Sequence, residues 1–492
     1  MKLDEYSSYD AMGLAQLVAA GEVTAAELSE LARAAADAVN PSINAIIEHW
    51  SIDDSGYAAP AGSGPLAGVP FLVKDLALSM AGKRVELGSR LARGLVAPSD
   101  SSLMTRFREA GLVTIGRTTT PEMAFSTTTE SIMQGPTRNP WQLDLSAGGS
   151  SGGAAAAVAA GVVPLAHATD AAGSIRVPAA YNGLFGLKPT RGRVSNGPAL
   201  DEVFAGLGVQ LGVSRTVRDS AALLDAVQGR ATGEPYFTAA PAQGFLFEVG
   251  RDPGRLKIGL MVDPWNGDRC DPAIAEATQA TARHLEQLGH RICIVQPSLG
   301  VSWDALVQAN AVIWTATLVG WIDGLASATG RPIDQTTLEP ATLACVRYGR
   351  QSSAVEFAAA LEVRNTVTRA IGGWFGQFDV LLTPTLPHLP PAIGIYNQGA
   401  ETLTGLEWTD RLFRHSPFTP PFNVAGVPAM SVPLESDPAT GLPIGMQFAA
   451  AFAREDVLLR LASQLEQSRP WKTRRPSIWA GSYMVLYGVS GC

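Results

Sequence analysis

Cysteine is scarce in this sequence. Among 492 residues it occurs only at Cys270, Cys293, Cys345 and Cys492, and no two of these have Cys-x-x-Cys spacing. This scatter argues against both a disulfide framework and a cysteine-ligated zinc site. We therefore expect reduced thiols, a cytoplasmic location and no bound metal or cofactor.

The chain also lacks an excess of basic residues. It has 37 Lys and Arg against 45 Asp and Glu, a formal net charge of −8. Because nucleic acids and anionic membranes require clustered Lys and Arg, neither is an expected partner. We expect no signal peptide, because residues 1–5 are acidic and lack an apolar core. We also expect no membrane span, because no run of about 18 apolar residues occurs. A neutral or weakly cationic small molecule fits better as the substrate.

The overall composition is typical of a globular protein. Hydrophobic residues make up 46% of the chain and charged residues 17%, which is enough apolar material for a large core. A chain of this length exceeds the size at which single cores usually split. Two domains, or one large elaborated core, are therefore expected.

Apolar periodicity predicts alternating strands and helices. The clearest helix is 24–40, where Thr24 and Glu27 have capping-box spacing and Pro41 should prevent continuation. The other helices and strands that we expect are helices 101–110, 216–227 and 273–288, and strands 43–48, 111–115, 257–261, 291–295 and 379–383. This pattern predicts an α/β fold with a central mixed sheet covered by helices on both faces.

A lysine stands at the end of one apolar strand. Residues 68–75 read Gly-Val-Pro-Phe-Leu-Val-Lys-Asp and end in Lys74 and Asp75. Burial of Lys74 would lower its pKa and leave a neutral amine able to act as a base. The alternative is a strand-end lysine whose ammonium reaches water. The spacing of these residues does not decide between the two.

A glycine-rich turn follows at 148–153, with the sequence Gly-Gly-Ser-Ser-Gly-Gly before an Ala-rich helix at 154–160. Such a turn can bind phosphate. Here, however, no Gly-Lys-Ser/Thr closes it as in a P-loop, and the order Gly-x-Gly-x-x-Gly of dinucleotide sites is absent. Two readings remain: a tight turn that lets a small-residue helix pack closely, or a site for a reactive hydroxyl.

A second serine turn lies 24 residues further on, at Ser174 in Asp-Ala-Ala-Gly-Ser-Ile-Arg, residues 170–176. The N–H groups before Ser174 could converge to form an oxyanion hole, but a serine nucleophile also needs a base. No histidine has an acidic partner at a recognisable spacing, Gly-x-Ser-x-Gly is absent, and His167 is expected to be a core residue. A serine–lysine arrangement is the remaining possibility.

Taken together, the motifs around Lys74, at 148–153, at 170–176 and at 186–193 (Gly-Leu-Lys-Pro-Thr-Arg-Gly-Arg) resemble the amidase signature family. The resemblance extends from about residue 10 to residue 470 and includes the segments 420–429 and 441–447. Four motifs in this order are highly specific. It implies the amidase signature fold in one large domain, 1–492, with a signature core at about 65–200 and a helix-rich substrate-pocket part at about 300–420.

The same resemblance implies the roles of individual residues. Ser174 matches the nucleophile, Ser150 the bridging serine that follows a cis peptide bond, and Lys74 the base, while Ser151 would support them by hydrogen bonding. An acyl-enzyme would form on Ser174. The backbone N–H groups that would hold the oxyanion belong to Ala171, Ala172, Gly173 and Ser174.

One position departs from the commoner family pattern, because Ala172 stands where that pattern has glycine. The oxyanion hole should survive if the φ of Ala172 is allowed. The Asp-Ala-Ala-Gly-Ser sequence is similar to a subgroup near the aminohexanoate cyclic-dimer hydrolases. This implies hydrolysis of a small-molecule amide: an anilide, a nylon-oligomer-like amide or a carbamate.

Other functions are left open by the sequence. The amidase-like subunit of a tRNA-dependent amidotransferase would share the triad, and a catalytically dead binding protein would keep only the fold. Intact Lys74, Ser150 and Ser174 argue against the latter. A homodimer is the default expectation for the oligomeric state.

Two downstream regions carry less specific expectations. Trp303, Trp314, Trp321 and Tyr348 are expected mainly in the core, with one or two of them at the pocket wall. The Pro-rich segment 385–420 is expected to be a long loop that covers the pocket opposite Ser174. The apolar tail 477–492 suggests no function.

Overall fold

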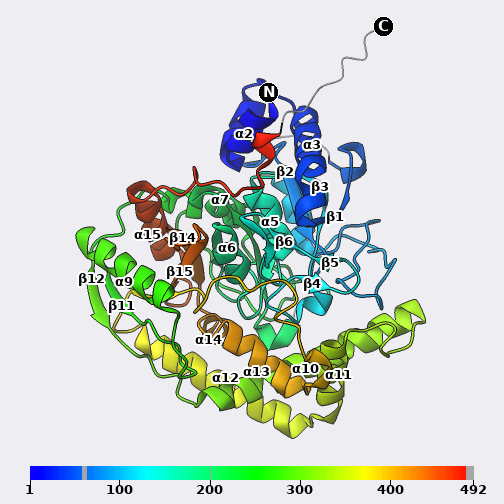
Figure 1. The fold of residues 1–492 in the computed structure, drawn as a ribbon, viewed down its shortest axis with the longest axis vertical. Helices are drawn as coiled ribbons and strands as arrows, with labels where there is room; N and C mark the ends of the chain where they lie inside the picture. Colours follow the sequence, from blue (N-terminus) through cyan, green and yellow to red (C-terminus); the bar gives the residue numbers. More distant parts are fainter. Residues whose placement is uncertain (58–63, 201, 484–492) are drawn as a thin grey trace.

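The architecture is a single mixed β-sheet surrounded by helices (Figure 1). It comes from a computed structural model that describes residues 1–57, 64–200 and 202–483. The eleven strands have the order β1-β3-β2-β8-β10-β9-β14-β15-β13-β11-β12. Their bounds are β1 Ile46–His49, β2 Pro70–Lys74, β3 Val113–Thr118, β8 Leu165–Asp170, β9 Phe185–Lys188, β10 Val209–Ser214, β11 Lys257–Leu260, β12 Arg291–Ile294, β13 Val380–Pro384, β14 Ala429–Ser436 and β15 Pro443–Ala450.

The pairing of the strands determines where side chains from different motifs meet. β2 pairs in parallel with both β3 and β8, whereas β10 is antiparallel to β8 and to β9. Because parallel strands end at the same edge of a sheet, the ends of β2 and β8 lie together. Four short strands form two separate ribbons: β4 Glu130–Ser131 with β5 Gly135–Pro136, and β6 Arg138–Asn139 with β7 Gln142–Ser146.

Helices cover both faces of the sheet. A Cβ atom on Gly186 of β9 would lie 2.7 Å from Ala179, and one on Gly212 of β10 would lie 2.9 Å from Leu223. Gly186 pairs with Val213, which neighbours Gly212. Successive strand residues point to opposite faces, so the helices that carry Ala179 and Leu223 lie on opposite sides. The predicted α/β fold is therefore confirmed.

The helices of this layer structure are α1 Leu3–Ser8, α2 Ala11–Ala19, α3 Ala25–Ile43, α4 Ser102–Glu109, α5 Gly152–Ala159, α6 Arg176–Asn182, α7 Val217–Val227, α8 Phe245–Glu248, α9 Pro272–Gln287 and α15 Glu455–Ser468. In α3, Thr24 and Glu27 form the predicted capping box. The predicted stop at Pro41 is wrong, because the helix continues to Ile43. A proline near the end of a helix removes only one backbone hydrogen bond, and here the acceptor left without it is the carbonyl oxygen of the exposed residue Asp37.

A second group of helices runs along the lower rim of the molecule in Figure 1. It comprises α10 Trp303–Thr329, α11 Pro340–Gln351, α12 Ala354–Trp374, α13 Gly405–His415 and α14 Pro420–Ala425. Their apolar faces form a second hydrophobic core. Within the described residues, α10 alone is long and apolar enough to cross a membrane, which the sequence pattern did not indicate. Yet 61% of its most apolar window is buried, and core helices of soluble proteins pass the same test.

Two further expectations differ from the structure. The strand predicted at 43–48 begins only at Ile46, because Asn44 adopts a left-handed conformation that ends α3. The segment 385–420 is not one long loop, since α13 occupies 405–415. Most of the tail 477–492 lies outside the described residues, apart from 477–483.

Candidate active site

The structure brings Lys74 and Ser150 into direct contact. Lys74 ends β2 with 1% of its surface exposed, and its Nζ lies 2.7 Å from Ser150 Oγ. The same Nζ lies 3.1 Å from Ser151 Oγ and 2.9 Å from Thr169 Oγ1. Thr169 stands near the end of the neighbouring strand β8, so the two parallel strands and the glycine turn supply the whole cluster.

Burial changes the protonation of this amine. Removal from water lowers the pKa of Lys74 to about 7, although the nearby carboxylate of Asp170 opposes the shift. Near neutral pH a large fraction of Lys74 is therefore uncharged. The alternative reading of a strand-end lysine that reaches water is wrong, because the side chain is buried.

The glycine turn lies so close to neighbouring threonines that side chains would not fit at two of its glycines. A Cβ atom on Gly149 would lie 2.5 Å from the Thr128 carbonyl oxygen, and one on Gly153 would lie 2.3 Å from Thr119 Oγ1. The peptide bond between Gly149 and Ser150 is cis, as the resemblance implied. The close packing expected of this turn is therefore confirmed, and the reactive hydroxyl stays a prediction.

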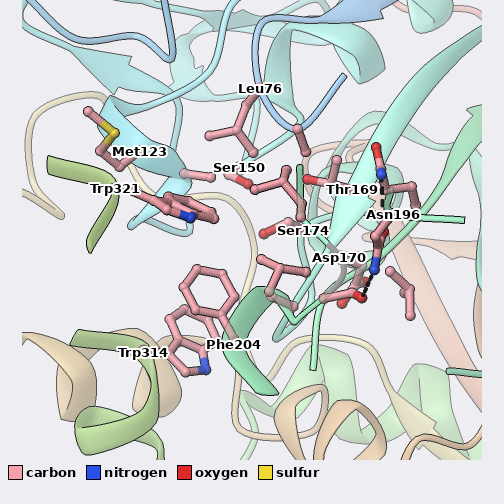
Figure 2. Close-up of a pocket in the computed structure, with 18 residues that line it drawn as sticks. Leu76, Met123, Ser150, Thr169, Asp170, Ser174, Asn196, Phe204, Trp314 and Trp321 are labelled. Carbon is pink, nitrogen blue, oxygen red and sulfur yellow. Dashed lines mark hydrogen bonds between the residues drawn. The ribbon is translucent and has the colours of Figure 1, made fainter. Parts of the chain in front are cut away.

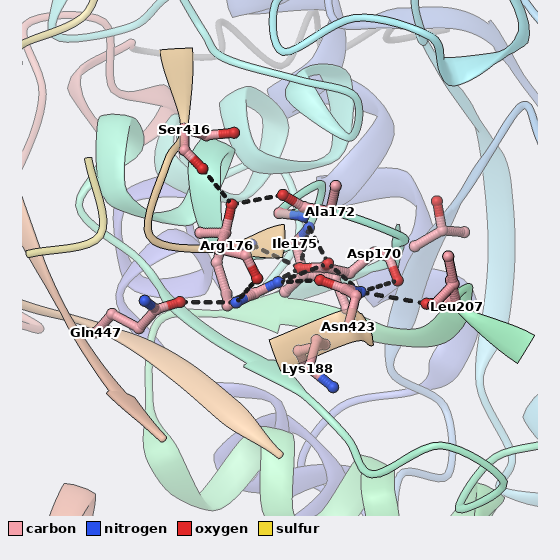
Figure 3. A network of polar contacts seen from close by, with 12 residues as sticks. Asp170, Ala172, Ile175, Arg176, Lys188, Leu207, Ser416, Asn423 and Gln447 are labelled. Atoms are coloured by element: carbon pink, nitrogen blue, oxygen red, sulfur yellow. Dashed lines mark hydrogen bonds and ion pairs between the residues drawn. The ribbon is translucent and has the colours of Figure 1, made fainter. Parts of the chain in front are cut away.

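The second serine turn is built around the carboxylate of Asp170. Its Oδ1 accepts a hydrogen bond of 2.7 Å from the Gly173 N–H, and its Oδ2 accepts one of 3.2 Å from the Ile175 N–H (Figure 3). The Gly173 N–H is therefore engaged with a carboxylate, which corrects its expected place in the oxyanion hole. The N–H groups of Ala171, Ala172 and Ser174 donate to no other group within the described residues.

Ala172 causes no backbone strain. Its φ is not in the left-handed region, whereas Gly173 has φ +135°, and a Cβ atom there would lie 2.5 Å from Thr419 Oγ1. Thr419 also donates a hydrogen bond to the Ala172 carbonyl. The methyl group that distinguishes this turn is thus accommodated, while the glycine that follows is required.

Arg176 fixes the Asp170 turn from within the core. Its Nη2 lies 2.9 Å from Asp170 Oδ1, and its Nη1 donates 2.7 Å to Gln447 Oε1. Asn423 Nδ2 donates a hydrogen bond of 3.0 Å to Asp170 Oδ1. Burial alone would raise the pKa of Asp170, but the charges of Arg176 and Lys188 overcome it, and the net pKa is below its usual value.

Several of these residues have no role in the sequence-based hypothesis. Thr169, Thr419, Arg176, Asn423 and Gln447 all contribute to the site through hydrogen bonds. Three of them lie within the quoted family motifs, at 170–176, 420–429 and 441–447. The motifs marked their importance, whereas only the fold shows what they contact.

Ser150 and Ser174 line one cavity, and their hydroxyls point into it (Figure 2). The cavity contains about 480 Å³ of empty space, including its open mouth. Its apolar wall includes Phe204, Trp314 and Trp321. No residue of 385–420 lines it, so the expectation that this segment covers the pocket is wrong.

His167 is a satisfied core residue, as predicted. Its Nδ1 accepts a hydrogen bond from the Lys74 backbone N–H, which leaves the proton on Nε2 to donate to Gln210 Oε1. Burial and the neighbouring Lys74 lower the pKa of His167 to about 3. The imidazole is therefore neutral and does not contact the serines. Within the described residues, no group of three or more His, Cys, Asp and Glu is arranged to bind a metal.

Comparisons with known proteins agree with this architecture. The Amidase family model matches residues 27–459. The 6-aminohexanoate-cyclic-dimer hydrolase of Paenarthrobacter ureafaciens is 37% identical over 482 residues, which cover 95% of this chain and 96% of that protein. The structure of a 6-aminohexanoate cyclic dimer hydrolase complexed with substrate superimposes with TM-score 0.88 at 35% identity, covering 96% and 99% of the two chains.

A bacterial aryl acylamidase of the amidase signature enzymes is also similar, with TM-score 0.87 and 26% identity over 97% of this chain and 99% of that one. The fold and the relatives define an enzyme that hydrolyses carbon–nitrogen bonds of amides. The chain belongs to the amidase signature family.

Proposed function

We propose that this enzyme hydrolyses uncharged amides through an acyl-enzyme on Ser174, with Ser150 as proton bridge and Lys74 as base. The observation that carries the proposal is the 2.7 Å contact between the buried Lys74 Nζ and Ser150 Oγ. Ser174 opens into the same cavity as Ser150. The similarity to hydrolases favours hydrolysis over ammonia transfer within an amidotransferase.

The proposed proton path combines the contact between Lys74 and Ser150 with the position of Ser174 in the same cavity. Neutral Lys74 accepts the proton of the Ser150 hydroxyl, Ser150 accepts that of Ser174, and Ser174 Oγ attacks the amide carbonyl. The proton then returns through Ser150 to the amide nitrogen. The carbon–nitrogen bond breaks, the amine leaves, and an ester remains on Ser174. Water attacks this ester by the same route, which releases the carboxylic acid and restores both hydroxyls.

The oxyanion is assigned to three backbone donors. In the described part of the chain, the N–H groups of Ala171, Ala172 and Ser174 donate to no other group, and fixed donors stabilise negative charge as it develops on the carbonyl oxygen. Asp170 engages the neighbouring Gly173 and Ile175 N–H groups and so holds the turn in one conformation. The charged carboxylate itself is compensated by Arg176.

The first prediction concerns pH. Below pH 7 the amine of Lys74, with its pKa lowered to about 7, carries a proton and accepts none. We expect kcat/KM to rise about tenfold per pH unit below pH 7 and to level off above about pH 8. The measurement is aniline release from a chromogenic anilide across pH 5–9. A rate that is highest near pH 5 would contradict the assignment of Lys74.

Lys188 provides a matched control for this titration. Burial, together with the charge of Arg176, also lowers the pKa of Lys188 to about 7, but its Nζ donates to the Pro189 carbonyl oxygen and contacts neither serine. The Lys188→Met variant should keep the rise of kcat/KM near pH 7. If the rise disappears in that variant, the titrating group is not Lys74.

The second prediction concerns substrate charge. Among the described residues that line the cavity, Asp170 is the only ionisable one, and it is paired with Arg176. A charged group on the substrate would lose its water without gaining a partner, which costs several kcal/mol. We expect kcat/KM for the cyclic dimer of 6-aminohexanoate to exceed that for the zwitterionic linear dimer by at least about 30-fold, which corresponds to ~2 kcal/mol.

An amine-release assay with both dimers measures this preference directly. The linear dimer capped at both ends, as an N-acetyl methyl ester, is the matched control because it keeps the chain and removes the charges. Capping should restore a large part of the activity. Equal rates on the capped and uncapped linear dimers would show that substrate charge is not what the cavity excludes.

A further inference from the structure

The cavity wall that faces the serines is aromatic. Phe204 stacks on Trp314 with ring centroids 4.9 Å apart and an interplanar angle of 17°. Trp321 lies against Phe204 at 5.3 Å and 47°. Figure 2 shows Trp321 and Phe204 across the cavity from Ser150 and Ser174, with Trp314 behind Phe204. The three rings thus form one surface, which we call the aromatic wall.

The aromatic wall is fixed from behind. Phe125 makes edge contacts with both Phe204, at 5.8 Å, and Trp314, at 5.4 Å. Trp314 is also in edge contact with Phe413 of α13, at 6.0 Å. Phe204 and Trp314 are buried within the second hydrophobic core. A ligand would therefore meet rings that are already positioned, which reduces the entropy lost on binding.

Backbone strain is concentrated around the same cavity. Phe204 and Ala205 have φ of 49° and 52°, and Met123 and Ala124 have φ of 52° and 59°. For residues other than glycine this left-handed conformation costs about 1–2 kcal/mol each. Four of the eight described non-glycine residues with positive φ line the cavity: Ala77, Met123, Ala124 and Phe204. Such conformations tend to cluster at ligand clamps.

The polar groups of the cavity lie away from this wall. Thr169 and Asp170 lie at the end of β8, and Ser150 and Ser174 lie in the two serine turns. Gln210, which pairs with Thr169, and its hydrogen-bond partner Asn196 also line the cavity on this side. The side chains opposite them offer flat apolar surface. A ligand that fits both sides has its amide at the serines and a flat, uncharged ring on the other side.

We propose that the aromatic wall, Phe204, Trp314 and Trp321, selects amides that carry an aromatic ring next to the scissile bond. The ring lies against Phe204 and Trp321 while the carbonyl faces Ser174. Offset or edge contacts between aromatic rings contribute beyond the area they bury. This inference rests on the proposed function, because it assigns the substrate class of the same cavity.

The test compares rings of similar size that differ in flatness. One pair is an anilide and the N-cyclohexyl amide of the same acid. The second pair is N-methylbenzamide and N-methylcyclohexanecarboxamide, which places the ring on the acyl side. Binding is measured by calorimetry with the Ser174→Ala enzyme, so differences in leaving-group reactivity do not contribute. We expect the aromatic member of at least one pair to bind about five- to tenfold more tightly.

Two substitutions at Phe204 separate selection from packing. Phe204→Leu keeps an apolar side chain without β-branching, so it tolerates the left-handed φ about as well but offers no ring face. In the Ser174→Ala background it should reduce the aromatic preference at least about threefold. Phe204→Tyr keeps the ring and should retain the preference within about twofold. The proposal would be overturned if Phe204→Leu weakened the binding of both members of each pair equally. It would also be overturned if the parent enzyme bound the aromatic and the saturated members equally tightly.

Turnover by the wild-type enzyme is measured on the same four compounds. If none is hydrolysed but the Ser174→Ala enzyme still binds the aromatic members more tightly, the proposed function fails and the selection by the aromatic wall stands. If hydrolysis occurs without aromatic preference in binding, the hydrolase assignment stands and the selection fails. The anilide pair and the benzamide pair also show whether the enzyme prefers the aromatic ring on the amine side or on the acyl side of the scissile bond.

Discussion

Replacing Ser174 with alanine is expected to reduce kcat by a factor on the order of 10⁴ to 10⁶, because an acyl-enzyme cannot form without the nucleophile. The fold should be unaffected, since Ser174 is a partly exposed residue at the cavity and its side chain makes no hydrogen bond within the described residues. Hydrolysis of an anilide and far-UV circular dichroism measure the two effects.

Covalent labelling locates the nucleophile independently of the rate. A fluorophosphonate should add to Ser174, and peptide mass spectrometry should find the adduct on the peptide that contains residues 170–176. Ser151 provides the control, because its hydroxyl contacts Lys74 Nζ without taking part in the proposed proton path. Ser151→Ala should still be labelled at Ser174, whereas Ser174→Ala should not be labelled at all. An adduct on another residue would remove the basis of the mechanism.

The sequence was sufficient to predict the parts of the site that are local in the chain. Lys74 at the end of an apolar strand, the serine in the glycine turn and the serine in the second turn could all be read from short motifs. The structure brings Ser150 into contact with Lys74 and places Ser174 in the same cavity as Ser150, while the catalytic roles of these residues stay a prediction. Local hydrogen-bond signals also placed the start of α3 correctly, at the Thr24 capping box.

What the motifs could not show was how each backbone donor is used. The Gly173 N–H was expected in the oxyanion hole, yet it donates to Asp170 three residues earlier. A one-dimensional pattern cannot distinguish an N–H that faces a ligand from one that faces a carboxylate. Only the three-dimensional course of the turn decides this, and it leaves Ala171, Ala172 and Ser174 as candidate donors.

Contacts between distant parts of the chain were equally invisible. Arg176 reaches Asn423 and Gln447, which are 247 and 271 residues away in the sequence. The aromatic wall combines Phe204 with two tryptophans of α10, and no residue of 385–420 lines the cavity beside them. These contacts depend on how helices and loops from distant parts of the chain pack around the sheet, and periodicity within one segment carries no information about that packing.

The buried pair of Asp170 and Arg176 gives the largest expected effect on stability. Both side chains are fully buried, and the two Asp170 oxygens accept bonds from Arg176, from Asn423 and from the backbone of the serine turn. Asn at position 170 would leave the Arg176 guanidinium without a counter-charge in the core. Breaking a buried pair in this way costs about 3–5 kcal/mol, so we expect Asp170→Asn to lower the free energy of unfolding by that amount in urea denaturation.

The same substitution should move the pH profile, which a purely structural role would not do. The Asp170 carboxylate raises the pKa of Lys74 against the effect of burial. Removing its charge therefore lowers the pKa of Lys74 further, and the rise of the residual kcat/KM should occur at a lower pH than in the wild type. The measurement is the anilide pH profile of Asp170→Asn at a temperature where the variant is folded.

A second buried ion pair provides a control that separates the loss of stability from the shift of the pH profile. Glu455 and Arg193 are also buried, and the Glu455 carboxylate lies 3.1 Å from the Arg193 guanidinium and accepts from the Thr190 N–H. Glu455→Gln should therefore lower stability by a comparable amount, while the pH profile keeps its wild-type position. If the pH profile shifts in both variants, the cause is a general loosening of the core and not the loss of the Asp170 charge. A shift in Asp170→Asn alone shows that this carboxylate acts on the amine of Lys74.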